Sequence, residues 1–201
     1  MPASSLTALQ NEIRSCRRCA DAGHPIQGAP VFSGRASARI FIVGQAPGAR
    51  EAELGKPFCG PSGQRLFAWL GKAGFSENEV RAHAYISALT RCYPGRAASG
   101  RGDRVPTREE LGWCRVHLDA ELARVKPELI LPVGRLAVRV FCGGAPLDAL
   151  VGTLQRDADG RWILPLPHPS GASAWLNRND HAAHLDRAIR HLTRLRQRLG
   201  L

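Results

Sequence analysis

Stretches of uninterrupted apolar residues predict four strands, which alternate with helical patterns along the chain. Residues 38–44, 85–89 and 129–134 are largely apolar without polar alternation, which is typical of strands buried on both faces. The run at 162–166 is expected to form a fourth strand, because an Asp-Ala-Asp-Gly turn at 157–160 precedes it. Strands of this kind belong to sheets that helices cover on both sides.

Apolar residues at helical spacing predict helices between and beyond these strands. The spacing at 6–13 predicts a first helix, and Ser62 is expected to cap a second one. A capping box at 107–110 opens a third helix, and a short fourth helix follows at 136–141. The C-terminal segment is expected to form an amphipathic helix with a basic outer face.

Strands that alternate with helices predict an α/β fold, a three-layer α/β/α arrangement around a central, mostly parallel four-stranded sheet. Ligands of such sheets bind beyond the carboxyl ends of the strands. Gln45, Ala88 and His168 all fall there, so these positions are the first candidates for a binding site. A chain of 201 residues is too short for two ordinary domains, so residues 1–201 are expected to form one.

The composition is that of a globular protein, with 44% hydrophobic and 22% charged residues. No apolar run approaches the ~20 residues that span a bilayer. The N-terminus lacks the basic-then-apolar pattern of a secretory signal. We therefore expect a cytoplasmic protein without a membrane partner.

The formal net charge of +11 favours a polyanionic partner, nucleic acid before membrane. A basic surface without a specific partner is the alternative, because nearly all the positive charge is arginine and genome base composition can produce that bias. The Gly- and Arg-rich stretch from Gly95 to Gly102 predicts a mobile basic loop. Arg96, Arg101 and Arg104, in and beside this loop, are expected to contact phosphates.

Three short motifs carry the strongest chemical signal. Gly-Gln-Ala-Pro-Gly at 44–48 follows an apolar strand, Pro-Phe-Cys-Gly-Pro-Ser-Gly occupies 57–63, and His-Pro-Ser occupies 168–170. Together they can place backbone amides, an aromatic face and a histidine donor around a flat polar ring. In this order they resemble the uracil-DNA glycosylase superfamily, most closely its iron–sulfur branch, families 4 and 5. The resemblance runs from about Cys16 to the final helix.

The resemblance implies roles for several residues of these motifs. His168 corresponds to the histidine that donates to the pyrimidine O2 as negative charge develops there. Phe58 is similar to the aromatic residue that stacks on the flipped base. Ser62, Gly63 and Ser170 are similar to the small residues that press on the DNA backbone, although plain turn and cap chemistry also explains them.

Two departures from the family pattern bear on mechanism and specificity. Family 4 has a glutamate at the position of Gln45, other branches have an aspartate at Ala46, and family 5 has one at Pro61, so the usual water-activating acids are absent. Ala88 replaces the asparagine that pairs with uracil in family 4; family 5, which also has alanine, accepts more deaminated bases. His168 and Gln45 are the catalytic candidates. The predicted pocket comprises Gln45, Ala46, Phe58, Ala88, His168 and Asn177, of which the last could also position water.

Six cysteines in a cytoplasmic protein are not expected to form disulfides. Cys16 and Cys19 form a Cys-x2-Cys pair, and Cys92 and Cys114 add thiols on either side of the basic loop. Four thiolates satisfy a [4Fe–4S] cluster and tetrahedral zinc equally well, so spacing leaves both open. Matching cysteines in families 4 and 5 imply a structural iron–sulfur cluster at these four positions.

These expectations converge on a monofunctional DNA glycosylase that flips and excises uracil in base-excision repair. Its DNA substrates are expected to include other deaminated bases such as hypoxanthine or xanthine, and the protein is expected to be a nucleoid-associated monomer. Because the usual acids are absent, a protein that flips and holds a damaged base without releasing it is the alternative. A polymerase-associated or RNA-binding relative is a third interpretation.

Overall fold

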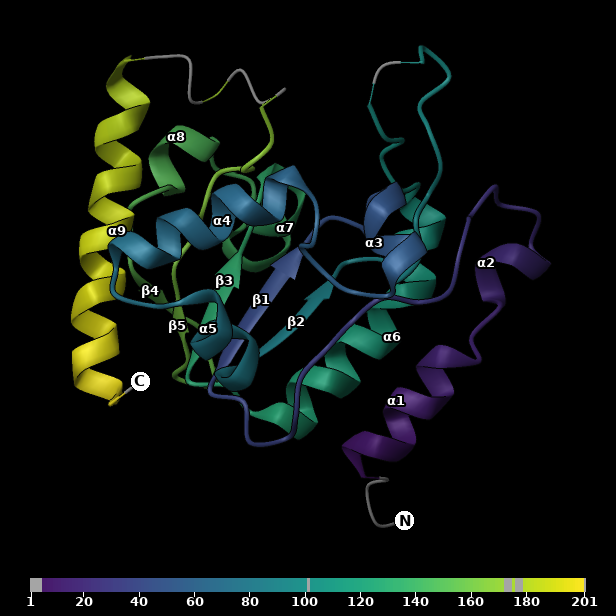
Figure 1. The fold of residues 1–201 in the computed structure, drawn as a ribbon, viewed down its shortest axis with the longest axis horizontal. Helices are drawn as coiled ribbons and strands as arrows, with labels where there is room; N and C mark the ends of the chain where they lie inside the picture. The colour runs from purple at the N-terminus through teal and green to yellow at the C-terminus, as the bar shows by residue number, and fades with distance from the viewer. Residues whose placement is uncertain (1–4, 101, 172–174, 176–178, 201) are drawn as a thin grey trace.

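A five-stranded sheet runs through the middle of the molecule (Figure 1). The structure is a computed structural model that describes residues 5–100, 102–171, 175 and 179–200. The strands are β1 (Ile40–Gly44), β2 (Ala84–Ala88), β3 (Leu129–Pro132), β4 (Gln155–Arg156) and β5 (Trp162–Ile163). They lie in the order β2-β1-β3-β5-β4, and every neighbouring pair is parallel except β4 and β5.

The four strands predicted from apolar runs are all present, but the predicted total of four was wrong by one short strand. β4 pairs with β5 across the predicted turn at 157–160, where the Gly160 amide donates to the Asp157 carbonyl oxygen (3.0 Å). The strand is two residues long, and its residues are half-buried or exposed. It therefore leaves no apolar run that a sequence pattern could detect.

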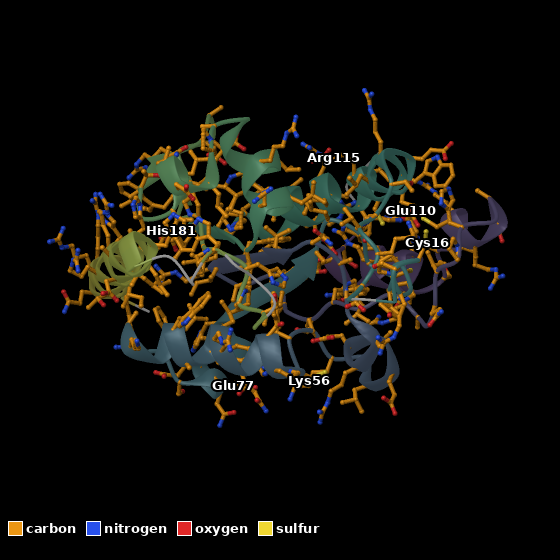
Figure 2. The ribbon with its side chains drawn as sticks, turned by 90° about the horizontal axis from the view of Figure 1, so that it is seen from above. Cys16, Lys56, Glu77, Glu110, Arg115 and His181 are labelled. Atoms are coloured by element: carbon orange, nitrogen blue, oxygen red, sulfur yellow. The ribbon has the colours of Figure 1, made fainter. Side chains whose placement is uncertain are left out.

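Helices cover both faces of the sheet, which confirms the α/β/α prediction, and Figure 2 shows the sheet between the two helical layers. One face carries α4 (Pro61–Lys72), α5 (Glu77–His83) and α9 (Asn179–Leu199); the other carries α1 (Leu6–Arg14), α6 (Arg108–Val125) and α7 (Arg135–Cys142). Connections contain the short helices α2 (Arg18–Asp21), α3 (Ala49–Leu54) and α8 (Leu147–Leu150). Along β1, Ile40 and Ile42 belong to the first core, Phe41 and Val43 to the second, which explains the uninterrupted apolar run.

Local capping explains where two of these helices begin. The Thr107 hydroxyl accepts from the Glu110 amide (3.2 Å), and the Glu110 carboxylate accepts from the Thr107 amide (2.6 Å), so the predicted capping box is confirmed. The cap predicted at Ser62 is wrong, because α4 begins at Pro61 and has Gly60 as its N-cap. Proline favours the first helical position, since its φ is preset and its missing N–H would have no partner there.

The C-terminal helix α9 is amphipathic, as predicted. Its apolar side packs into the first core through Leu185, Ile189, Leu192 and Leu195. Its other side exposes arginines at 187, 190, 194 and 198. Neither α9 nor any other helix that the structure describes is long and apolar enough to cross a bilayer.

The carboxyl ends of the parallel strands meet along one edge of the sheet. The register of β1 and β2 pairs Gly44 with Ala88, so the segments that follow these strands leave the sheet side by side. His168 reaches the same edge, because Leu166 pairs with Val133 just beyond β3 and β5. The turn after β1 and the His-Pro-Ser motif are thereby brought together.

Candidate functional site

A cavity of about 290 Å³ opens at this edge of the sheet. It is bounded by the ends of β1 and β2, the turn after β1, residues 57–62 and His168. Its volume lies near the lower end of the range for small-molecule sites. The residues that line it include five of those singled out from the sequence, namely Ala46, Phe58, Ser62, Ala88 and His168.

Phe58 lies across the end of β1. A Cβ atom at Gly44 would lie 3.3 Å from Cζ of the Phe58 ring, so glycine leaves room for the ring there. The Phe58 backbone has a φ of 50°, a conformation that costs a non-glycine residue about 1–3 kcal/mol. Arg81 stabilises it by donating to the carbonyl oxygens of Pro57 and Phe58, both at 3.1 Å. Gly63 is buried against that segment, because a Cβ there would lie 1.9 Å from the Phe58 oxygen.

One carboxylate ties together the two turns beside the cavity. Glu51 accepts from the amide of Gly48 (3.2 Å) through Oε2 and from the amide of Gly60 (3.2 Å) through Oε1. The first amide belongs to the turn after β1, and the second lies at the start of α4. Glu51 thus fixes these segments relative to each other, and both of its oxygens are engaged.

His168 is oriented by its own motif. The Ser170 amide donates to Nδ1 of His168 (3.2 Å), and the Ser170 hydroxyl lies 2.8 Å from the same atom. Nδ1 is therefore an acceptor, so the neutral ring carries its proton on Nε2. The ring is partly open to solvent, yet desolvation by the surrounding protein lowers the pKa of His168 and favours the neutral form. Gly134 permits this close approach, because a Cβ there would lie 3.0 Å from the ring.

A buried ion pair supports the end of β2 at Ala88. Arg91 and Glu121 are 1% and 0% exposed and bind each other directly. Arg91 also donates to the carbonyl oxygen of Ala88 (2.7 Å). Glu121 accepts from the hydroxyls of Tyr85 (3.0 Å) and Ser87 (3.3 Å). An unpaired charge would be strongly destabilising here, so the ion pair has to stay intact. Its hydrogen bonds connect the end of β2 to α6.

Asp103 also lines the cavity, although no sequence motif pointed to it. The Tyr93 hydroxyl donates to Oδ1 of Asp103 (3.0 Å), and Oδ2 lies 3.4 Å from the position of a Cβ on Gly48. The loop that carries Asp103 is closed at its base, where the Arg104 amide donates to the Gly95 carbonyl oxygen (2.8 Å). An acidic residue in an otherwise Gly- and Arg-rich stretch is the signal that could have found it.

Two other predicted site residues that the structure describes, Gln45 and Arg96, do not line the cavity. Gln45 is half-buried and is not among the described residues that line the cavity. Arg96 is exposed on the loop that carries Asp103. Arg101 and Asn177 lie outside the described residues.

Arg104 is engaged inside the protein, where the sequence analysis expected a phosphate contact. Its guanidinium donates to both carboxylate oxygens of Glu110, at 2.7 and 2.8 Å. Glu110 is buried, and hydrogen bonding to Arg104 is the main reason why its pKa falls to about 2. Arg104 therefore closes the loop onto α6, and its guanidinium is engaged by Glu110.

The four cysteines of the predicted cluster line one small cavity beside α6. Cys16 and Cys19 come from the junction of α1 and α2, Cys92 from the segment after β2, and Cys114 from α6. Burial, reinforced by the neighbouring thiols, raises the pKa of Cys92 to about 12 and that of Cys19 to about 11. His117 lies one helical turn beyond Cys114, with Nε2 3.4 Å from the Cys16 sulfur. In Figure 2, Cys16 lies at the same end of the molecule as Glu110.

Four thiols of this kind are the donor chemistry of both a zinc ion and an iron–sulfur cluster. One zinc ion requires all four sulfurs at about 2.3 Å from it. Among the described residues, no group of three or more His, Cys, Asp or Glu is arranged to hold one ion. The present cavity of about 10 Å³ has room for about one water, so the thiols would have to turn outward around a cluster.

A family model described as the uracil DNA glycosylase superfamily matches residues 31–193. The chain belongs to the uracil DNA glycosylase superfamily. The matched region contains every described residue that lines the larger cavity, as well as Cys92 and Cys114. The resemblance inferred from the three motifs is therefore confirmed.

Named members of the superfamily's type-4 and type-5 branches are similar to this chain. The type-4 uracil-DNA glycosylase of Thermotoga maritima is 30% identical over 142 residues, which cover 70% of this chain and 69% of that protein. The type-4 uracil-DNA glycosylase of Archaeoglobus fulgidus is 33% identical over 135 residues, which cover 67% of this chain and 62% of that protein. The type-5 uracil-DNA glycosylase of Pyrobaculum aerophilum is 33% identical over 151 residues, which cover 68% of this chain and 63% of that protein. The chain thus spans about two thirds of the length of these relatives.

Proposed function

We propose that this protein is a monofunctional DNA glycosylase that excises uracil from DNA in base-excision repair. The observation that carries the proposal is one cavity, in a member of this superfamily, that combines the Phe58 ring with the oriented His168 donor. The names of the similar type-4 and type-5 proteins support it. In this proposal residues 1–201 form one glycosylase domain, which acts as a monomer in the cytoplasm, associated with the nucleoid.

The base has to leave the DNA stack before it can enter the cavity. Extrusion costs a few kcal/mol, and stacking on an aromatic ring such as Phe58 returns about 1–3 kcal/mol. Cleavage of the N-glycosidic bond then leaves negative charge on the departing base. The Nε2–H of His168 donates to the O2 atom of uracil as that charge grows. Comparable donors in other enzymes contribute roughly 2.7–4 kcal/mol.

Weak recognition of the base edge extends the proposal to other deaminated bases. The side chain of Ala88 offers no hydrogen bond, and its carbonyl oxygen already accepts from Arg91. The hydroxyl of Ser87, which also lines the cavity, is bonded to Glu121. Where the wall that faces the base edge has no unsatisfied polar group, a different flat ring meets little penalty. Hypoxanthine and xanthine are therefore proposed as additional substrates.

Four described residues remain as proposed contacts to the DNA backbone, namely Ser62, Gly63, Arg96 and Ser170. Arg96 is exposed beside the cavity, and Ser62 lies in the first turn of α4, where a helix N-terminus favours phosphate. The packing of Gly63 and the bond of Ser170 to His168 give those two residues additional structural roles. The net charge of +11 is consistent with a polyanionic partner.

The proposal includes a structural [4Fe–4S] cluster held by the four cysteines that line the smaller cavity: Cys16, Cys19, Cys92 and Cys114. When bound, such a cluster supplies a cross-link and takes no part in base release. It would join the α1–α2 junction to α6 and to the segment that leads into the Asp103 loop. The four cysteine thiolates are the usual ligands of such a cluster, which supports this assignment, as does the similarity to type-4 glycosylases.

Alkaline treatment of labelled oligonucleotides tests the proposed activity. Single- and double-stranded substrates with uracil, hypoxanthine, xanthine or no lesion are incubated with the protein and then heated in alkali, which breaks the strand at an abasic site. We expect cleavage at uracil and none in the undamaged control. A gel shift specific to uracil without strand cleavage would instead identify a protein that flips and holds the base.

A further inference from the structure

The proposed reaction needs negative charge and a placed water at the sugar, but the positions where the superfamily has acids hold Gln45, Ala46 and Pro61. We propose that Asp103 supplies this carboxylate from the loop between β2 and α6. This inference rests on the proposed base excision. It adds a catalytic residue that comes from outside the three sequence motifs.

The contacts of Asp103 suit this role. The Tyr93 hydroxyl holds Oδ1, while Oδ2 faces the turn after β1, at 3.4 Å from the place of a Cβ on Gly48. In other members of the superfamily, this turn carries the acidic residue, at the position of Gln45 or of Ala46. Asp103 makes no ion pair with any Lys, Arg or His in the described part of the chain. Its charge is therefore available to a ligand in the cavity.

Among the described residues, Glu51 is the other carboxylate that lines the cavity, and both of its oxygens already accept hydrogen bonds. Its two oxygens accept from the amides of Gly48 and Gly60, each at 3.2 Å. Moving Glu51 to bind water would release both turns and leave those amides without a partner. Asp103 has Oδ1 held by Tyr93, while Oδ2 lies beside Gly48, which lines the cavity with it and leaves this oxygen free to act as a general base.

The chemical step balances without another reactant. A water bound to Oδ2 of Asp103 attacks C1′ of the deoxyribose as the bond to the base nitrogen breaks. The bonding electron pair leaves with the base, whose O2 charge His168 stabilises, and Asp103 accepts the proton of the water. The ionised carboxylate also stabilises positive charge on the sugar, as carboxylates do in glycoside hydrolysis. The products are an abasic site and the free base, which takes a proton from solvent.

The substitution Asp103→Asn tests the assignment, because it removes the charge and keeps the size. We expect the single-turnover rate of uracil release to fall about a hundredfold, in the range for loss of a general base. The dissociation constant for uracil-containing DNA and the melting temperature should stay near those of the wild type. Asp103→Glu should recover at least tenfold over Asp103→Asn, because it restores the carboxylate. Asp119→Asn, at an exposed aspartate of α6, is the matched control and should leave the rate unchanged.

Three outcomes would overturn the assignment while base excision stands. They are an unchanged rate in Asp103→Asn, a loss of DNA affinity in proportion to the loss of rate, and no recovery in Asp103→Glu. A wild-type protein that binds uracil-containing DNA and releases no base would refute the proposed function itself, and the role of Asp103 with it. The wild-type assay thus separates the two failures.

Discussion

His168 presents a donor on Nε2 because Ser170 engages the other ring nitrogen, and desolvation lowers the pKa of His168, which favours the neutral ring. That donor matters most when the departing base carries charge, so its loss falls on the transition state rather than on binding. We expect His168→Ala to slow uracil release by about a hundredfold or more. Single-turnover kinetics and a binding titration on the same DNA measure the two effects. An equal loss of affinity would assign His168 to substrate binding instead.

In the proposed reaction, Ala88 sets how strongly the cavity discriminates between bases. An asparagine at this strand end could pair with both O4 and N3–H of uracil and would leave its amide unpaired against other rings. We expect the wild type to release uracil and at least one deaminated purine. Ala88→Asn should keep uracil release and suppress purine release. Competition between uracil and hypoxanthine substrates gives the ratio, and a wild type confined to uracil would contradict the relaxed pocket.

At the scale of elements, two arginines of the loop between β2 and α6 lie in different surroundings. Arg96 is exposed, whereas Arg104 is bonded to the buried carboxylate of Glu110. Arg96→Ala should flatten the dependence of log affinity on log salt by about 0.9 on duplex DNA. Arg104→Ala should instead lower the free energy of unfolding by about 3 kcal/mol, because it leaves a buried charge unpaired. Salt titrations should therefore detect the effect of Arg96→Ala on DNA binding, and denaturant unfolding should detect the effect of Arg104→Ala on stability.

Acid pH provides a control for the Arg104 prediction. The pKa of Glu110 falls from 4.5 to about 2 in the folded protein, mainly through Arg104 and also through the Thr107 amide. Stability from the pair is therefore fully present above pH 4.5 and is lost as the pH falls towards 2. The difference in unfolding free energy between wild type and Arg104→Ala should shrink over that interval. A constant difference would mean that Arg104 acts through packing alone.

Sequence patterns predicted the strands that are buried on both faces and missed the strand whose residues are partly exposed. β1, β2 and β3 were found because strands covered on both faces are apolar throughout. β4 was missed because a two-residue edge strand owes its existence to its partner, and its own residues carry no pattern. The cap at Ser62 was misplaced because a proline one residue earlier already satisfies the geometry of a helix start.

For the molecule as a whole, the sequence predicted the site residues that lie in motifs or at strand ends, and it missed Asp103, which tertiary contacts bring to the cavity. Phe58, Ala88 and His168 belong to motifs or strand ends, so their position follows from the topology of the sheet. Asp103 reaches the cavity only through tertiary closure of its loop, including the bond to Tyr93. No spacing rule encodes such a contact.

The proposed cluster would join parts of the molecule that the sheet does not connect. α1 reaches the second core through three apolar residues, while the cysteines link its end to β2 and α6. Because binding energy at such a site is folding energy, Cys19→Ser should bleach the visible colour of the purified protein and lower its melting temperature. Cys142→Ser, a half-buried thiol elsewhere in the fold, is the matched control and should keep the colour. Iron, sulfide and zinc analysis decides the metal, and stoichiometric zinc without iron would refute the cluster.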